Sequence, residues 1–165
     1  MQGSLRTNKN KFVLYPGPWL FYPDSKNKPM KLLMIYCSKF AYTPQIHTLT
    51  DFPEVKDGAV FTDALVAFIH AEEQDEENGK AVETKMLKNL KWAAKKNNTK
   101  KVVLHSFAHL AETKASPQIT KELFDKVEAR LQNADYECAQ TPFGYFLDID
   151  VQAPGVSQAR IFKNI

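Results

Sequence analysis

Cysteine is scarce in this sequence of 165 residues, which contains only Cys37 and Cys138, about one hundred residues apart. Neither belongs to a CxxC pair, so the sequence indicates a reduced protein without a disulfide framework. No structural zinc site is recognisable. This usage is typical of cytoplasmic proteins, and we expect that location.

Long apolar runs are missing as well. The most apolar stretch near the N-terminus, KFVLYPGPWLFYP, is broken by prolines and a glycine, and no small-residue cleavage site follows it. A membrane-spanning helix needs roughly 20 apolar residues, so we expect neither a signal peptide nor a contact with a membrane. The formal net charge of +3 permits an anionic partner without requiring one.

The composition that remains is that of a globular protein, with 44% hydrophobic and 25% charged residues. The chain divides near Met30. Residues 1–29 are rich in Asn, Lys and Pro, whereas an apolar run of strand length begins at residue 30. We expect an N-terminal extension over residues 1–29, which either packs on the domain or is a disordered or misassigned leader, and a single domain over residues 30–165.

Beyond Met30, strand-like and helix-like patterns alternate. Residues 65–72 and 101–107 are short apolar runs suited to strands buried on both faces, and residues 136–152 resemble two strands joined by a turn. Two helices are predicted, one over residues 79–98 and one that begins at Ser116 and Pro117. Their apolar residues recur at four-residue steps (Val82, Met86, Leu90 and Ala94; Ile119, Leu123, Val127 and Leu131). The pattern predicts one compact α/β domain in which helices pack on a mixed sheet.

Lysines crowd the first predicted helix and its exit. Trp92 falls among Lys85, Lys88 and Lys96 on a helical wheel. Such a face suits nucleic acid, because lysines hold phosphates and the ring is free to stack. The commoner alternative is a solvated lysine face, with the tryptophan covered by the N-terminal extension.

The histidines do not indicate a metal site. His105 and His109 lie four residues apart, but His105 lies in a predicted strand and is followed by Ser106 instead of a Glu. Ser106 lacks the glycine-flanked turn of a serine nucleophile. We therefore expect no metal and no cofactor. His109 follows a buried strand directly, where open α/β sheets bind ligands, so it either orients a water or substrate oxygen or is a structural residue.

Four segments carry a resemblance to a known family: MKLLMIYC, LVAFIHAEEQDEEN, VVLHSFAHLAETKA, and AQTPFGYF with the following APG. Together they resemble the N-terminal editing domain of archaeal-type threonyl-tRNA synthetases, which is related in fold to the D-aminoacyl-tRNA deacylases. The resemblance runs from Met30 almost to Ile165. It implies a free-standing editing domain without an ATP or amino-acid activation site.

The activity that this resemblance implies is hydrolysis of the ester of a mischarged tRNA, with serine on threonine tRNA as the substrate. The terminal ribose 2′-hydroxyl is expected to help place the attacking water. By position, His109 is expected to orient the water or the ribose hydroxyl. The backbone of Pro142, Phe143 and Gly144 is expected to line the aminoacyl pocket, and Tyr145 matches a family tyrosine. The related deacylase fold also implies a homodimer.

The chain departs from the family at two positions. Leu147 stands where the archaeal enzymes have a lysine, and Arg160 falls near the position of a family acid. Lys39 is a candidate to bring an amine to the same crevice, and Arg160 a candidate to hold a phosphate or the terminal ribose. A solvated lysine and a surface salt bridge are the alternatives. The departures also leave open a non-catalytic tRNA-binding or regulatory module and, more distantly, a small-molecule hydrolase or ligand-binding protein.

Overall fold

The secondary structure follows the predicted alternation of strands and helices. The computed structural model describes residues 29–165, so the expected N-terminal extension lies outside the described residues except for its last position. The elements, in chain order, are β1 (Lys31–His47), β2 (Ala59–His70), η1 (Glu73–Glu76), α1 (Gly79–Lys96), β3 (Lys101–Ser106), α2 (Pro117–Gln132), β4 (Glu137–Gln140), β5 (Tyr145–Gln152), η2 (Ser157–Ala159) and β6 (Arg160–Asn164).

The strands form one mixed sheet in the order β4-β3-β2-β1-β5, with β6 also paired to β1. β2, β3 and β4 are parallel neighbours, whereas β1 runs antiparallel to β2, β5 and β6. Residues 31–35 of β1 pair with β6 and residues 39–47 pair with β5, so these two short strands share one edge of β1.

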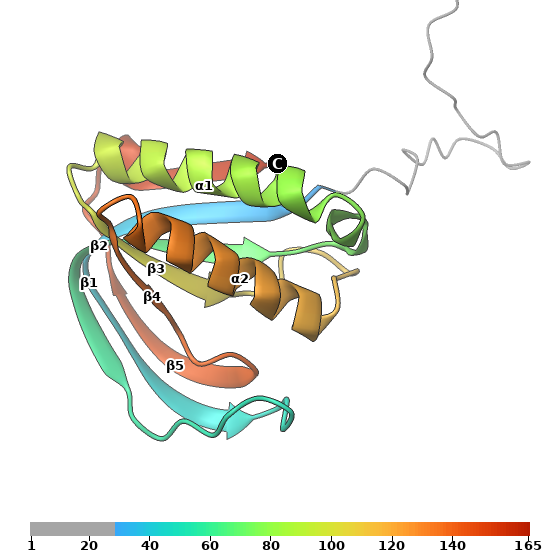
Figure 1. Cartoon of the computed structure of the whole chain (residues 1–165). Helices are drawn as coiled ribbons and strands as arrows, with labels where there is room; N and C mark the ends of the chain where they lie inside the picture. The colour runs from blue at the N-terminus through green and yellow to red at the C-terminus, as the bar shows by residue number, and fades with distance from the viewer. Residues whose placement is uncertain (1–28) are drawn as a thin grey trace, which may run out of the picture.

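Both helices cover the same side of this sheet (Figure 1). In α1 the predicted stripe is buried as expected. In α2 the Ser116 Oγ accepts a hydrogen bond from the Ile119 N–H at 3.4 Å, which confirms the predicted helix start. Ile119 itself is 40% exposed, and Thr120 is buried in its place. A helix has about 3.6 residues per turn, so residues at four-residue steps move gradually around its circumference. Ile119, the first residue of the series, therefore lies outside the buried face.

Residues 64–70 of β2 are buried on both faces of the sheet, as the apolar run predicts. One apolar cluster lies between the sheet and the helices, and a second lies on the other face around Phe40, Val66 and Phe68. None of the helices in residues 29–165 is long and apolar enough to cross a membrane.

The connection between β4 and β5 imposes the curvature of the sheet. The two strands are joined by residues 141–144, as the predicted turn requires, yet they occupy opposite ends of the strand order. If the paired residues are followed from β4 through β3 and β2 to β1, Gln140 lies level with Met34. Tyr145, by contrast, pairs with His47, which lies thirteen residues further along β1.

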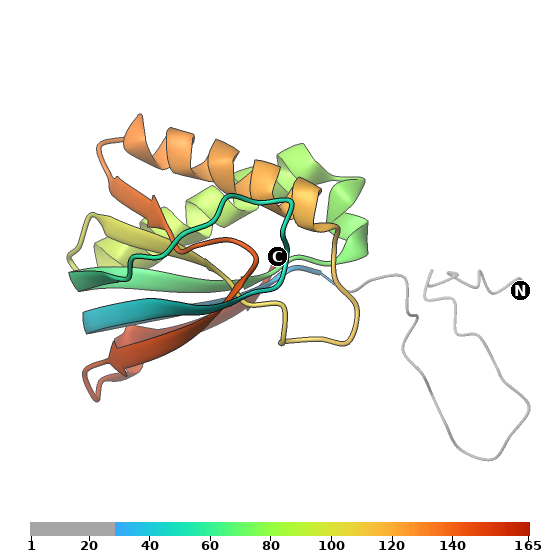
Figure 2. The same cartoon turned by 90° about the horizontal axis from the view of Figure 1, so that it is seen from below.

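In a straight β1 those thirteen residues would span about 43 Å, at about 3.3 Å per residue. The connection from Gln140 to Tyr145 reaches at most roughly 18 Å, at up to about 3.6 Å per residue. The long strand must therefore curl until its far end approaches the end of β3. Figure 2 shows this connection passing from the helix side of the sheet to β5.

Gly144 makes this short connection feasible, because its φ of +80° lies in the left-handed region that favours glycine. A Cβ atom at this position would lie 2.7 Å from the Leu49 Cβ.

We expect Gly144→Ala to lower the free energy of unfolding by about 1–3 kcal/mol in urea titrations. Gly155→Ala is the matched control, because a Cβ there meets no atom within 4 Å. Equal stability of the two variants would contradict this role.

Candidate functional site

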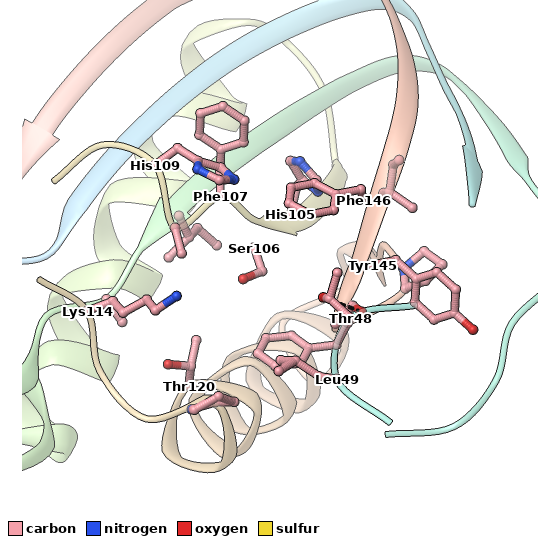
Figure 3. Close-up of a pocket in the computed structure, with 18 of the residues that line it drawn as sticks. Thr48, Leu49, His105, Ser106, Phe107, His109, Lys114, Thr120, Tyr145 and Phe146 are labelled. Carbon is pink, nitrogen blue, oxygen red and sulfur yellow. Dashed lines mark hydrogen bonds between the residues drawn. The ribbon is translucent and has the colours of Figure 1, made fainter. Parts of the chain in front are cut away.

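The curled sheet encloses a cavity of about 370 Å³ beside the end of β3 (Figure 3). Three segments supply most of its wall: the end of β3 with the loop that follows it, the start of α2, and the connection into β5. The lining residues most important for the site are Thr48, Leu49, His105, Ser106, His109, Lys114, Thr120, Pro142, Phe143, Gly144, Tyr145 and Leu147. Its volume falls in the range typical of small-ligand sites, about 300–1,000 Å³.

The Gly144 carbonyl is a hydrogen-bond acceptor in the wall of the cavity. It accepts hydrogen bonds from the Thr48 N–H at 2.7 Å, the Leu49 N–H at 3.2 Å and the Thr48 hydroxyl at 2.9 Å. These bonds fasten the segment after β1 to the turn before β5. Phe143 contributes an aromatic wall beside them, with its ring centroid 4.8 Å from that of Phe52.

Tyr145 lines the cavity, but its hydroxyl is engaged elsewhere. The hydroxyl oxygen accepts a hydrogen bond from the Val55 N–H at 2.9 Å. The ring stacks on His47 with the centroids 4.3 Å apart and the planes 5° from parallel. Figure 3 shows the hydroxyl pointing away from Ser106 and Lys114. In this structure Tyr145 therefore holds the wall together and does not offer its hydroxyl to a bound molecule.

His105 is a cavity residue that the sequence analysis did not select. It is buried at the end of β3, and its Nδ1 lies 2.8 Å from the hydroxyl oxygen of Thr141, which is also buried. Burial, and to a smaller extent the nearby His109, lowers the pKa of His105 to about 4. The ring is therefore neutral at pH 7. Successive side chains along β3 point to opposite faces of the sheet. This alternation is the sequence signal that could have placed His105 on the face opposite Leu104.

His109 lies at the exposed rim of the cavity. Its ring contacts Phe107 and Phe146, at centroid distances of 5.3 and 6.0 Å. Its backbone N–H donates to the Phe107 carbonyl at 2.8 Å, which tightens the chain directly after β3. The imidazole is therefore accessible to solvent beside the cavity.

The loop that carries His109 and Lys114 is fastened by two buried residues at the end of β2. His70 Nε2 donates to the Thr113 carbonyl at 2.7 Å, and His70 Nδ1 accepts from the Leu110 N–H at 3.3 Å. A neutral imidazole protonated at Nε2 satisfies both bonds. Glu72 accepts a hydrogen bond from the Thr113 hydroxyl at 2.7 Å and from the Lys31 ammonium at 2.7 Å.

Two predicted contacts do not reach this cavity. The Lys39 ammonium is paired with Asp150 at 2.7 Å, between β1 and β5. Arg160 donates to the Pro154 carbonyl at 2.8 Å. Neither residue lines the cavity, so their placement does not support the predicted contacts with a substrate there. The strand pairing explains both placements. Lys39 lies midway along β1, and Arg160 begins β6, which pairs with the half of β1 that does not pair with β5.

The lining residues have an unbalanced charge pattern. His105, His109, Lys114 and Tyr145 are the ionisable side chains among them, and none of the lining residues is an Asp or Glu. No group of three or more His, Cys, Asp or Glu residues within residues 29–165 is arranged to hold a metal ion. The cavity is therefore suited to neutral or anionic oxygen groups.

Comparisons with known proteins bear on this geometry. Residues 30–165 match the family model described as the archaea-specific editing domain of threonyl-tRNA synthetase. The chain is 31% identical over 119 residues to a threonine–tRNA ligase of Methanopyrus kandleri, covering 71% of this chain and 19% of the ligase. It is 27% identical over 138 residues to that of Methanosphaera stadtmanae, covering 82% of this chain and 22% of the ligase. The chain thus spans about a fifth of the length of these curated relatives.

A solved structure described as c-Myc DNA Unwinding Element Binding Protein shares the fold, with a TM-score of 0.58 and 9% identity, over 82% of this chain and 98% of that one. The predicted fold class, a D-aminoacyl-tRNA deacylase-like α/β domain, is confirmed.

The anchoring role of Glu72 predicts a pH dependence. Burial raises the pKa of Glu72, but hydrogen bonds from Lys31 and Thr113 outweigh it and lower the pKa below its usual value. Because the folded-state pKa is depressed, ionised Glu72 stabilises the fold above its unfolded pKa, and this contribution is lost as the pH falls through the folded pKa. We expect Glu72→Gln to lower the free energy of unfolding by about 1–3 kcal/mol at pH 7.

Urea titrations from pH 7 to pH 3 measure this difference, which should shrink toward zero at the acid end. The exposed Glu73→Gln is the matched control, with an expected change near zero throughout. The anchoring role of Glu72 would be contradicted if the difference in free energy of unfolding between Glu72→Gln and the unmodified chain stayed constant with pH.

Proposed function

The chain belongs to the archaea-specific editing-domain family of threonyl-tRNA synthetases, and we propose that it hydrolyses the ester bond of a mischarged tRNA. Serine on threonine tRNA is the proposed substrate. One observation carries the proposal: His109 and the segment Pro142 to Tyr145, selected from the sequence for this activity, line one cavity although more than thirty residues separate them.

The need for such a reaction follows from the small difference between serine and threonine. A binding site gains only about 1–3 kcal/mol from one methyl group, so a synthetase cannot reject the smaller serine by affinity alone. A second site that admits serine and destroys its ester corrects the error. Leu49, Phe143 and Gly144 line this cavity, and they are proposed to select a small side chain.

The proposed reaction is a direct hydrolysis. The oxygen of a water molecule bonds to the ester carbonyl carbon, and the carbonyl electron pair moves onto its oxygen. When this tetrahedral intermediate collapses, the bond from the carbon to the ribose oxygen breaks. One proton of the water passes to the ribose oxygen, and the other is released to solvent by the carboxyl group of serine. His109, at the rim, is proposed to orient the water or the ribose hydroxyl.

Leu147 favours a second candidate, a tRNA-binding or regulatory module without chemistry. It lines the cavity where the family resemblance implies a lysine, and Arg160, near the position of the family acid, lies outside it. In this case the protein binds uncharged threonine tRNA with a strong salt dependence and releases no amino acid. Trp92 is a second place for RNA contact, although Lys96 and Lys163 already lie over its ring, at 5.1 and 5.5 Å from the centroid.

The cytoplasmic location and the homodimer implied by the resemblance remain predictions. Apolar side chains on β5 and β6 support the homodimer, because they stay well exposed in the isolated chain (Phe146, Ile149, Val151 and Phe162).

Release of labelled serine from Ser-charged threonine tRNA tests the proposed activity. We expect the purified protein to release serine faster than threonine, and His109→Ala to be slower by about 10²-fold, the lower range for a positioned acid–base group. Glu112→Ala is the matched control, because Glu112 is exposed in the same loop and does not line the cavity.

Two results would contradict the deacylase proposal. One is a rate at background for a panel of mischarged tRNAs, and the other is identical rates for His109→Ala and the unmodified protein. Salt-dependent binding of uncharged tRNA without turnover would then favour the binding module.

A further inference from the structure

Lys114 brings a positive charge into the cavity from the loop between β3 and α2. We propose that its ammonium acts on the reacting ester, by donating a hydrogen bond to the oxyanion that forms when water attacks the carbonyl carbon. This inference rests on the proposed function. It assigns the cationic role to a residue that the sequence analysis did not select.

The backbone of Lys114 is held on both sides. The preceding residue, Thr113, is fixed through its carbonyl by His70 and through its hydroxyl by Glu72, each at 2.7 Å. The Ala115 N–H donates to the Ala71 carbonyl at 2.9 Å, which ties the next residue to the end of β2. The side chain therefore begins from a fixed point on the cavity wall, although the residue lies in a loop.

Figure 3 shows the Lys114 side chain extending into the cavity, with its amine directed toward the space between Ser106 and Thr120. Leu147 and His109 line the same cavity. The amine thus faces the same space that the proposed serine ester would occupy.

The charge of this ammonium is uncompensated within the described part of the chain. Lys114 forms no ion pair or hydrogen bond with residues 29–165, as is also true of exposed lysines such as Lys88, whereas Lys39, the other candidate amine, is paired with Asp150. No carboxylate lines the cavity. The start of α2 lies beside it, and the positive end of that helix also favours an anion.

Lys114 is exposed, and an ammonium that is unpaired in the ground state fits one moment of the proposed reaction. The intact ester is uncharged at its carbonyl, and the substrate's own amino group is repelled by Lys114. Negative charge appears on the carbonyl oxygen only in the tetrahedral intermediate. A donor that reaches the carbonyl oxygen as this charge develops stabilises the transition state more than the bound substrate. Its loss should therefore lower kcat and leave KM nearly unchanged.

Serine release by three variants tests this role. We expect Lys114→Met to lower kcat on the order of 10²-fold, Lys114→Arg to retain more activity than Lys114→Met, and Lys126→Met to match the unmodified protein. Lys126 is the matched control because it is exposed on α2 and does not line the cavity. The double variant Lys114→Met with Leu147→Lys returns an amine to the cavity from β5, and we expect it to recover part of the lost rate. An unchanged kcat for Lys114→Met, or a rise in KM alone, would overturn the proposal.

A binding measurement separates this inference from the proposed function, because it needs no turnover. The probes are a seryl amide of 3′-amino-3′-deoxyadenosine, which is uncharged at the carbonyl, and an adenosine 3′-ester of the phosphonate analogue of serine, whose tetrahedral phosphorus carries an anionic oxygen. We expect Lys114→Met to weaken binding of the phosphonate at least about tenfold and to leave binding of the amide unchanged.

Selective loss of phosphonate binding supports the role of Lys114 even if the unmodified protein releases no serine, in which case the proposed function alone fails. Equal effects on the two probes would overturn the role of Lys114 even if the protein is an active deacylase. Circular dichroism of each variant checks that the fold is retained.

Discussion

The short connection from β4 to β5 is the constraint on which the rest of this structure depends. Residues 141–144 join strands at opposite ends of the sheet, and a chain of that length cannot bridge them unless β1 curls through its second half. The left-handed backbone of Gly144 makes the turn, and its carbonyl binds the segment after β1. The curvature, the cavity and the position of Leu147 in its wall all follow from this connection.

A second fixed element completes the site. The end of β2 carries His70 and Glu72, which hold the loop after β3 through hydrogen bonds to Thr113 and Leu110. Burying a polar side chain costs free energy unless its hydrogen bonds are formed. Here the hydrogen bonds that His70 and Glu72 form also position the loop. His109 and Lys114 are therefore carried by a segment without regular structure that is nevertheless tied to the sheet at several points.

The sequence predicted the parts of the fold that depend on local patterns. Local patterns placed α1, the Ser116 helix start and the buried β2 correctly, and the family resemblance selected the cavity residues His109 and Pro142 to Tyr145. The sequence did not predict the strand order, because β4 and β5 are consecutive in sequence but distant in the sheet. Lys39 was selected since it follows an apolar run, whereas pairing with β5 places Asp150 beside it. Lys114 was missed because a lone loop lysine has no distinctive pattern until folding directs it into a cavity.

A crystal structure with the seryl amide of 3′-amino-3′-deoxyadenosine bound tests the central claim most directly, namely that this cavity is an aminoacyl-ester site. We expect the seryl group inside the cavity, with its carbonyl oxygen facing Lys114, its side chain against Phe143 and Gly144, and the ribose next to His109. Binding of the seryl group outside the cavity, or with the carbonyl turned away from Lys114 and His109, would contradict it.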